Sequence, residues 1–261
     1  MGGVVRRRRL VGHLKSADLG ECMIAKALTE IRWITKVGIS EVRASSAVES
    51  WGTNVNTDWR SIMSYSIVGF GKIGQALAHA FARKNIDVTV ASRRLPEALA
   101  PQARAIGPTV VAKSLRGALE ADTIILAVPF GEHREVAKAL PSWKGKTVVD
   151  AMNALVPPEE LDGLLSSAFV AKSFTGAKVV KGFNHLVAAT LATDPIVEGG
   201  HRVVFLSSDD EDAIAPVADL AKQLGFAPVK LGKFNEGGAL VHARGKTWGR
   251  LIFQDLFKKQ Q

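Results

Sequence analysis

The sequence predicts an α/β protein with a doubly wound, mostly parallel sheet. From Ser64 onward, short β-branched runs alternate with segments of roughly ten to fifteen residues whose apolar side chains recur at spacings of three and four. A glycine-rich turn follows the first of these runs directly, at residues 69–74. Such alternation is typical of parallel strands that are joined by right-handed helical crossovers, with helices on both faces of the sheet.

The elements are expected at regular intervals along this region. The first five strands are Tyr65–Val68, Asp87–Ala91, Thr109–Ala112, Thr123–Ala127 and Thr147–Asp150. The helices between them are Ile73–Arg83, Leu95–Ala105, Ser114–Ala121 and Glu132–Leu140. After residue 150 we expect extra C-terminal strands at Lys178–Lys181, Arg202–Leu206 and Ala227–Lys230, and a helix at Asp212–Leu224.

The composition favours a globular protein in a reducing compartment. No apolar run approaches the roughly 18 residues that a membrane span needs. The only cysteine, Cys22, excludes an internal disulfide and a cysteine-based metal site. The net charge of +9 comes from basic residues that are scattered apart from Arg6–Arg9 and Arg93–Arg94, so it indicates an anionic small ligand. We expect a cytoplasmic protein with no metal, nucleic-acid or membrane partner.

The first 62 residues differ from the rest of the chain, because they show no clear strand alternation and hold Trp33, Trp51 and Trp59. We divide the chain into an N-terminal extension, 1–62, and a nucleotide-binding domain, 63–261. The extension is expected to be poorly ordered or to reflect a misassigned start, since the first strand begins shortly after Met63. The alternatives are a targeting segment, which Arg6–Arg9 suggests, and a genuine extension that docks on the domain.

The glycine-rich turn Gly69-Phe70-Gly71-Lys72-Ile73-Gly74 is a G-x-G-x-x-G motif between a predicted strand and a predicted helix. In a Rossmann-type fold the first glycine permits the tight turn, the second admits a pyrophosphate, and the third lets helix and strand pack closely. The free N–H groups and the dipole of the following helix hold the phosphates. The flanking elements favour dinucleotide binding over a glycine-rich turn that binds nothing.

The end of the second strand distinguishes NADP(H) from NAD(H). An enzyme selective for NAD places an Asp or Glu there, to accept hydrogen bonds from the ribose 2′-OH. This sequence has Ser92-Arg93-Arg94 instead. Guanidinium groups make charge-assisted, often bidentate bonds to phosphate oxygens, so these residues suit a 2′-phosphate. We therefore expect the cofactor to be NADP(H), the alternative being a solvated basic loop.

Several blocks resemble one known family in order and approximate spacing: "SIVGFGKIGQALA", "TVASRR", "ADTIILAVPF", "VVDAMNAL", "KVVKGFN" and "LGKFNEGGALV". They are similar to the F(420)H2:NADP oxidoreductase-like family, over about Ser64 to Leu240. The resemblance implies an NADP-dependent reductase that passes a hydride between NADPH and a small-molecule redox acceptor. It implies that the acceptor is a deazaflavin or flavin, such as coenzyme F(420), FMN or FAD, bound at the carboxyl ends of the strands.

Further site candidates follow the later strands. The fourth strand ends in residues that can flank the nicotinamide and its ribose: Ala127, Val128, Pro129 and Phe130. Asn153 follows the fifth strand, where its amide could bind the ribose or the nicotinamide, or cap the next segment. Gly182, Phe183 and Asn184 follow the sixth strand and are candidates either for the acceptor pocket or for the core and a turn.

The catalytic residues stay unassigned, because hydride transfer between two rings needs orientation and water exclusion rather than acid–base help. His133 and His185 could protonate or bind an acceptor, although such histidines are more often solvated or structural. His79 is expected at the surface. The other functions that we consider are an NADP-dependent dehydrogenase of a small carbonyl or imine, a metal reductase that uses a free flavin, and a non-catalytic NADP(H)-sensing protein. A homodimer is an option for the oligomeric state.

Overall fold

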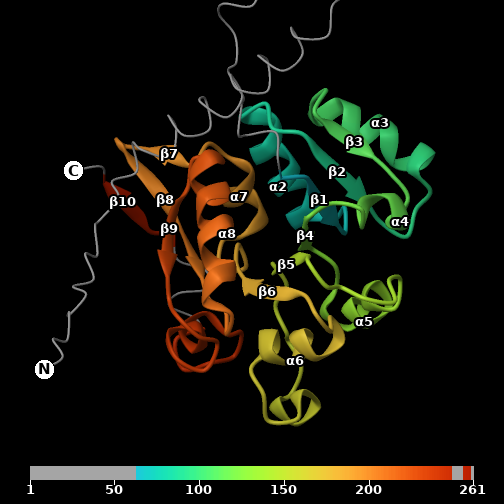
Figure 1. The fold of residues 1–261 in the computed structure, drawn as a ribbon. Helices are drawn as coiled ribbons and strands as arrows, with labels where there is room; N and C mark the ends of the chain where they lie inside the picture. The colour runs from blue at the N-terminus through green and yellow to red at the C-terminus, as the bar shows by residue number, and fades with distance from the viewer. Residues whose placement is uncertain (1–62, 249–254, 260–261) are drawn as a thin grey trace, which may run out of the picture. The chain divides into compact units, whose positions relative to one another are not determined.

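The computed structural model describes residues 63–248 and 255–259, and its central feature is a six-stranded sheet (Figure 1). The strands are β1 (Tyr65–Val68), β2 (Val88–Ala91), β3 (Val110–Ala112), β4 (Thr123–Leu126), β5 (Thr147–Asp150) and β6 (Lys178–Lys181). Their order is β3-β2-β1-β4-β5-β6, and all neighbours pair in parallel. This is the strand order of the Rossmann fold, so the predicted fold class is confirmed. The predicted extension, 1–62, lies outside the described residues, and its assignment stays a prediction.

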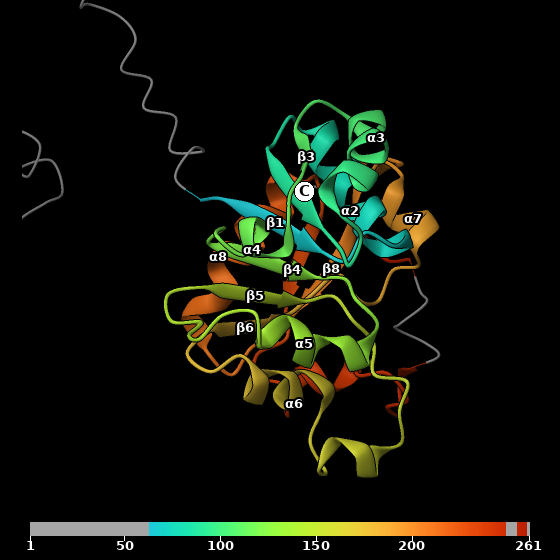
Figure 2. The ribbon, with the colours of Figure 1, turned by 90° about the vertical axis from the view of Figure 1, so that its right-hand side faces the viewer.

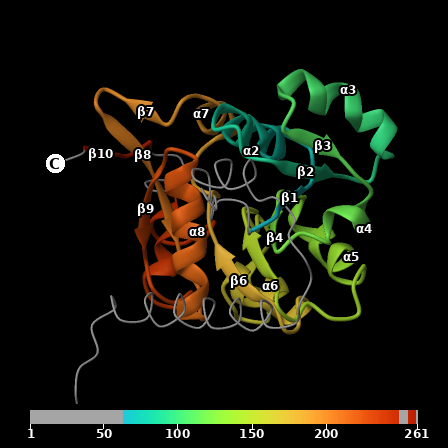
Figure 3. The ribbon, with the colours of Figure 1, turned by 45° about the horizontal axis from the view of Figure 1, so that its top comes forward.

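Helices cover both faces of this sheet (Figure 2). One face packs against α2 (Lys72–Arg83), α3 (Pro96–Ile106), α7 (Ala188–Ala192) and α8 (Glu211–Gln223). The other face packs against α4 (Leu115–Ala118), α5 (His133–Ala137) and α6 (Ser166–Ser173). Helix α7 lies beside α2, as Figure 3 also shows.

The central strand β4 is apolar on both faces because each face meets a helical layer. In β4, Ile125 belongs to the core formed with α2, while its neighbours Ile124 and Leu126 belong to the core around Trp143. All three β4 side chains are fully buried. This is the pattern expected of a parallel sheet with two covered faces, and it explains why the sequence shows continuous apolar runs rather than alternation there.

The C-terminal part adds a smaller group of strands. Strand β8 (Gly200–Leu206) pairs in parallel with β9 (Ala227–Lys230), and in antiparallel fashion with β7 (Ile196–Val197) and β10 (Phe257–Lys259). A single antiparallel bridge between Lys181 and Ser207 joins this group to β6. The predicted extra strands are therefore present. Strand β7 was not predicted, because two residues are too few to show alternation.

Short helices account for the main differences from the predicted elements. The segment predicted as Ser114–Ala121 is helical only at α4, where the Ser114 Oγ accepts a hydrogen bond from the Gly117 N–H at 3.1 Å. The segment predicted as Glu132–Leu140 is α-helical only at α5, which follows directly on a 3₁₀ turn, η2 (Phe130–Glu132). Two further 3₁₀ turns are η3 (Pro158–Leu161) and η4 (Gly237–Val241). Within the described part of the chain, no helix has the length and apolar character needed to cross a membrane.

Candidate active site

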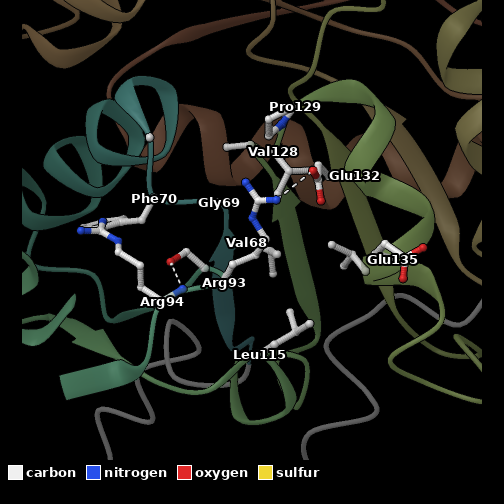
Figure 4. Close-up of a pocket in the computed structure, with 14 residues that line it drawn as sticks. Val68, Gly69, Phe70, Arg93, Arg94, Leu115, Val128, Pro129, Glu132 and Glu135 are labelled. Carbon is white, nitrogen blue, oxygen red and sulfur yellow. Dashed lines mark hydrogen bonds and ion pairs between the residues drawn. The ribbon is translucent and has the colours of Figure 1, made fainter. Parts of the chain in front are cut away.

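A cavity of about 610 Å³ lies at the carboxyl ends of β1, β2 and β4 (Figure 4). We call it the first cavity. It brings together nine of the residues predicted to bind the cofactor, Gly69, Phe70, Gly71, Ser92, Arg93, Arg94, Ala127, Val128 and Pro129. Val68, Leu115, Glu132, Glu135 and Val136 complete its lining. Because parallel strands end at the same edge of the sheet, three segments that are far apart in the sequence meet here.

The three glycines of the turn have different surroundings. Gly69 has φ of +103°, a conformation that favours glycine. A Cβ at Gly74 would lie 1.9 Å from the Gly69 carbonyl oxygen, so α2 and β1 pack too closely for any other residue. A Cβ at Gly71 would meet no atom within 4 Å. The backbone at Gly71 therefore leaves open space at the N-terminus of α2, where no side chain caps the helix.

The two arginines after β2 have different partners. The Arg93 Nη1 lies 3.1 Å from the Glu132 Oε1, whereas the Arg94 Nη2 donates a hydrogen bond to the Gln102 Oε1 at 3.2 Å. The Ser92 Oγ accepts a hydrogen bond from the Arg94 backbone N–H at 3.0 Å and so fixes the turn between them. Both guanidinium groups belong to residues that line the first cavity, as the fit to a 2′-phosphate requires.

A second cavity, of about 330 Å³, adjoins the first and shares Ala127 and Val128 with it. Its lining includes two other predicted cofactor residues, Ile73 and Asn153. The remaining lining residues are Ala151, Met152, Asn184, Leu186, Val187 and Ala188. The second cavity is therefore mostly apolar, with the asparagines as its polar groups.

Asn153 and Asn184 are hydrogen-bonded to each other. The Asn153 Nδ2 donates to the Asn184 carbonyl oxygen at 2.9 Å, and the Asn184 Nδ2 donates to the Asn153 Oδ1 at 3.0 Å. The Asn184 Nδ2 also donates to the Val241 carbonyl oxygen at 3.0 Å. These acceptors fix the orientation of both amides. Asn153 therefore lies in the second cavity, and its amide is bonded to Asn184.

Three predicted cofactor residues do not line either cavity. Lys72 is exposed at the start of α2, and Gly74 is buried in the contact between helix and strand. Phe130 packs in an aromatic cluster, with ring centroids 5.0 Å from His133 and 6.1 Å from Phe169. Of the three residues predicted for the acceptor pocket, only one lines a cavity. Asn184 lines the second cavity, while Gly182 and Phe183 lie in the core.

Two of the histidines, His133 and His185, are buried in the protein. His133 is buried, and its Nδ1 is bonded to the Phe130 carbonyl oxygen. His185 is fully buried with its ring 4.9 Å from that of Phe205. Burial lowers the pKa of His185 to about 4, against smaller opposing effects of the Val203 backbone and Asp255. His79 is exposed, as expected.

A buried ion pair next to the second cavity was missed by the sequence analysis. The Lys181 Nζ lies 3.2 Å from the Asp150 Oδ2, and both side chains are almost fully buried. Burial lowers the pKa of Lys181, while Asp150 opposes this shift. The pair holds the Met152 backbone, since Lys181 donates to the Met152 carbonyl oxygen and the Met152 N–H donates to the Asp150 Oδ1 at 2.9 Å. A charged residue at the end of each of two neighbouring parallel strands was the signal that could have revealed it.

One further group adjoins this pair. The Ser167 Oγ donates to the Asp150 Oδ2 at 2.6 Å. The pKa of His242 is lowered, mainly by burial and further by the charge of Lys181, with Asp150 opposing. Among the described residues, no group of three or more His, Cys, Asp or Glu side chains could hold a metal ion.

Known proteins resemble this chain in sequence and in fold. The family model for NADP oxidoreductases, coenzyme F420-dependent, matches residues 64–154. A hypothetical protein, SMa0349, from Sinorhizobium meliloti is 39% identical, with a TM-score of 0.71, and the match covers 78% of this chain and 100% of that chain. A putative F420-dependent NADP reductase from Arthrobacter sp. FB24 is 26% identical, with a TM-score of 0.55, over 66% of this chain and 86% of that chain.

The metalloreductase STEAP3 from Rattus norvegicus is 27% identical over 168 residues, which are 64% of this chain and 33% of that protein. The chain spans about a third of the length of the curated relatives that it matches. The matched region 64–154 holds the glycine turn, the arginines and the β4 loop that together line the first cavity. Residues 64–154 of this chain thus form a domain that matches the family of NADP oxidoreductases, coenzyme F420-dependent.

Proposed function

We propose that the protein transfers a hydride between NADP(H), held in the first cavity, and a deazaflavin or flavin acceptor that enters the second. The observation that carries this proposal is that the two cavities adjoin at Ala127 and Val128. A dinucleotide that lies along the glycine turn would place its nicotinamide near this junction, because the phosphates sit at the N-terminus of α2. A ring in the second cavity would then lie beside the nicotinamide.

The residues of the first cavity fit NADP(H). The open space at Gly71 admits a pyrophosphate to the backbone, and Arg93 and Arg94 supply two cations for the 2′-phosphate. Leu115 and Val136 supply an apolar wall for the adenosine. The bound nicotinamide would supply the hydride, while the residues of the chain bind it, orient it and exclude water.

The second cavity suits a flat ring with a polar edge. Its apolar side chains can cover the faces of the ring, and the paired amides of Asn153 and Asn184 can meet polar atoms at its edge. Neither His133 nor His185 lines this cavity, which supports transfer between two rings over reduction of a carbonyl or imine that must be protonated.

The test is to mix the purified protein with NADPH and one acceptor at a time, and to follow NADPH oxidation by absorbance. The acceptors are coenzyme F420, FMN, FAD, ferric ion with and without FMN, and a set of ketones and imines. We expect turnover with at least one deazaflavin or flavin, and its loss in the Gly71→Val variant. Turnover with ketones or imines alone would replace the proposed acceptor, and NADPH binding without any turnover would favour a sensing protein.

A further inference from the structure

Arg93 and Glu132 join two loops that line the first cavity. Arg93 follows β2, and Glu132 ends the 3₁₀ turn after β4. Their side chains meet at 3.1 Å, as the dashed line in Figure 4 marks. The Arg93 side chain is 84% exposed and that of Glu132 is 34% exposed, so either one can move without disturbing the core.

The second arginine has no such acidic partner among the contacts of the described residues. Arg94 bonds to the neutral amide of Gln102 in α3. An ion pair between exposed side chains contributes little stability, and a dianionic phosphate is a stronger partner for a guanidinium than a single carboxylate. Arg93 can therefore pair with Glu132 in the free protein and exchange that carboxylate for a 2′-phosphate when the cofactor binds.

We propose that Glu132 is a specificity-determining residue, which competes with the 2′-phosphate of NADP(H) for Arg93. This inference rests on the proposed function, because it assumes that NADP(H) occupies the first cavity. NADP(H) must displace the carboxylate to reach Arg93, whereas NAD(H) has no 2′-phosphate and leaves the ion pair intact. Glu132 thereby lowers the affinity for NADP(H) and has little effect on the affinity for NAD(H).

Glu135 provides a matched control. It lines the same cavity and carries the same charge, but its Oε1 bonds to the Lys138 Nζ at 2.7 Å. Glu132 itself makes no side-chain bond that caps α5, so Glu132→Gln removes the negative charge without removing a helix cap. The two glutamine variants therefore separate competition for Arg93 from the general effect of a nearby negative charge.

The experiment measures the dissociation constants of NADP⁺ and NAD⁺ by calorimetry at low and high salt. The proteins are the wild type, Glu132→Gln, Glu135→Gln, Arg93→Ala and the double variant Arg93→Ala/Glu132→Gln. We expect Glu132→Gln to tighten NADP⁺ binding about two- to fivefold at low salt, with NAD⁺ unchanged and a smaller gain for Glu135→Gln. In the Arg93→Ala background the gain from Glu132→Gln should disappear, because no guanidinium remains to be released.

Four results would overturn the inference. Weaker binding of both cofactors by Glu132→Gln would mean that the carboxylate contacts the ligand. The gain in NADP⁺ affinity from Glu132→Gln could persist in the Arg93→Ala background, or Glu135→Gln could give an equal gain. Either result would mean that removing any negative charge near the cavity has the same electrostatic effect. No change in the dissociation constant of either cofactor would mean that Glu132 does not compete with the 2′-phosphate for Arg93. A wild-type protein that fails to bind NADP⁺ would instead refute the proposed function, and the inference with it.

Discussion

Gly74 packs against the carbonyl oxygen of Gly69, and a Cβ at position 74 would come within 1.9 Å of that oxygen. Gly71, in the same turn, is different, since a Cβ there would meet no atom within 4 Å and its φ of −82° suits any residue. Two glycines of one motif thus have separate roles. Gly74 is required by the contact between α2 and β1, whereas no contact within the described part of the chain requires a glycine at position 71.

Valine substitutions should separate these roles. Gly71→Val should abolish NADPH binding while circular dichroism and the unfolding midpoint stay close to the wild type, because the side chain fills the space that a pyrophosphate needs. Gly74→Val should lower the free energy of unfolding by about 3 kcal/mol or more, because the backbone must shift. Urea unfolding and calorimetric titration measure both effects. A Gly71→Val protein that still binds NADPH would contradict the placement of the pyrophosphate.

The choice of cofactor should depend on Arg93. Removing a charge-assisted hydrogen bond typically loses about 1.5 to 3 kcal/mol, so Arg93→Ala should weaken NADPH binding roughly tenfold or more. NADH binding should change little, because NADH has no 2′-phosphate. Titration of both cofactors into the variant and the wild type measures this. If Arg93→Ala lost equal affinity for NADPH and NADH, Arg93 would instead support the fold or bind the pyrophosphate. If the wild-type protein bound the two cofactors equally well, the expected selectivity for NADP(H) would be wrong.

Most of the first cavity could be predicted from the sequence, because its residues follow strands directly. Gly69, Arg93 and Val128 each lie just after a β-strand, and parallel strands bring such residues to one edge. Phe130 is only slightly further along, but the 3₁₀ turn η2 directs it toward Phe169. Side-chain direction in a turn depends on local geometry that apolar periodicity does not encode.

The second cavity could be predicted only in part. Asn153 was expected to bind the ribose or the nicotinamide after the fifth strand, or to cap the next segment. Its bonds to Asn184 depend on a loop after β6 in which Phe183 has φ of +59°. A non-glycine residue in that conformation leaves no mark in the sequence. The buried Lys181 was missed for a related reason. Lysine is almost always exposed, and only the register of β5 against β6 places it opposite Asp150.

Neither histidine should act as a general acid or base. Losing such a group costs about 10² to 10⁴ in kcat, whereas His133→Gln and His185→Phe should keep kcat within about tenfold, for the fraction of protein that is folded. Both rings lie outside the cavity linings and pack against phenylalanines. Stopped-flow measurement of NADPH oxidation provides the rate. A thousandfold loss in kcat with unchanged NADPH affinity would instead indicate a carbonyl or imine substrate.

His185 should make the stability depend on pH. Its folded pKa of about 4 lies below the unfolded value of 6.5, so the unfolded chain binds a proton more readily between these values. The contribution is complete above pH 6.5 and is lost as the pH falls toward 4, by an amount on the order of 3 kcal/mol. Urea unfolding at several pH values should show this decline, and His185→Phe should reduce it. An unchanged slope in that variant would assign the decline to other groups.

Breaking the buried ion pair should destabilise the fold. Lys181→Met leaves the Asp150 carboxylate buried without a countercharge, and breaking such a pair typically costs about 3 to 5 kcal/mol in the free energy of unfolding. Adding Asp150→Asn removes the remaining charge, so the double variant should be more stable than Lys181→Met alone. Lys178→Met is the control on the same strand. The Lys178 side chain is half exposed and its Nζ lies 3.9 Å from the Asp210 Oδ1, so this substitution should change stability by at most about 0.5 kcal/mol.

The same variants report on the second cavity, because Lys181 donates to the Met152 carbonyl oxygen and Asn153 follows directly. Loss of that bond should loosen the Asn153 turn and lower kcat/KM for the acceptor, while the dissociation constant of NADPH stays within about twofold, since the first cavity does not include this turn. Steady-state kinetics at saturating NADPH, with calorimetry alongside, measure the two quantities. If acceptor turnover and NADPH binding fell together, the ion pair would support the whole domain rather than the turn beside the second cavity.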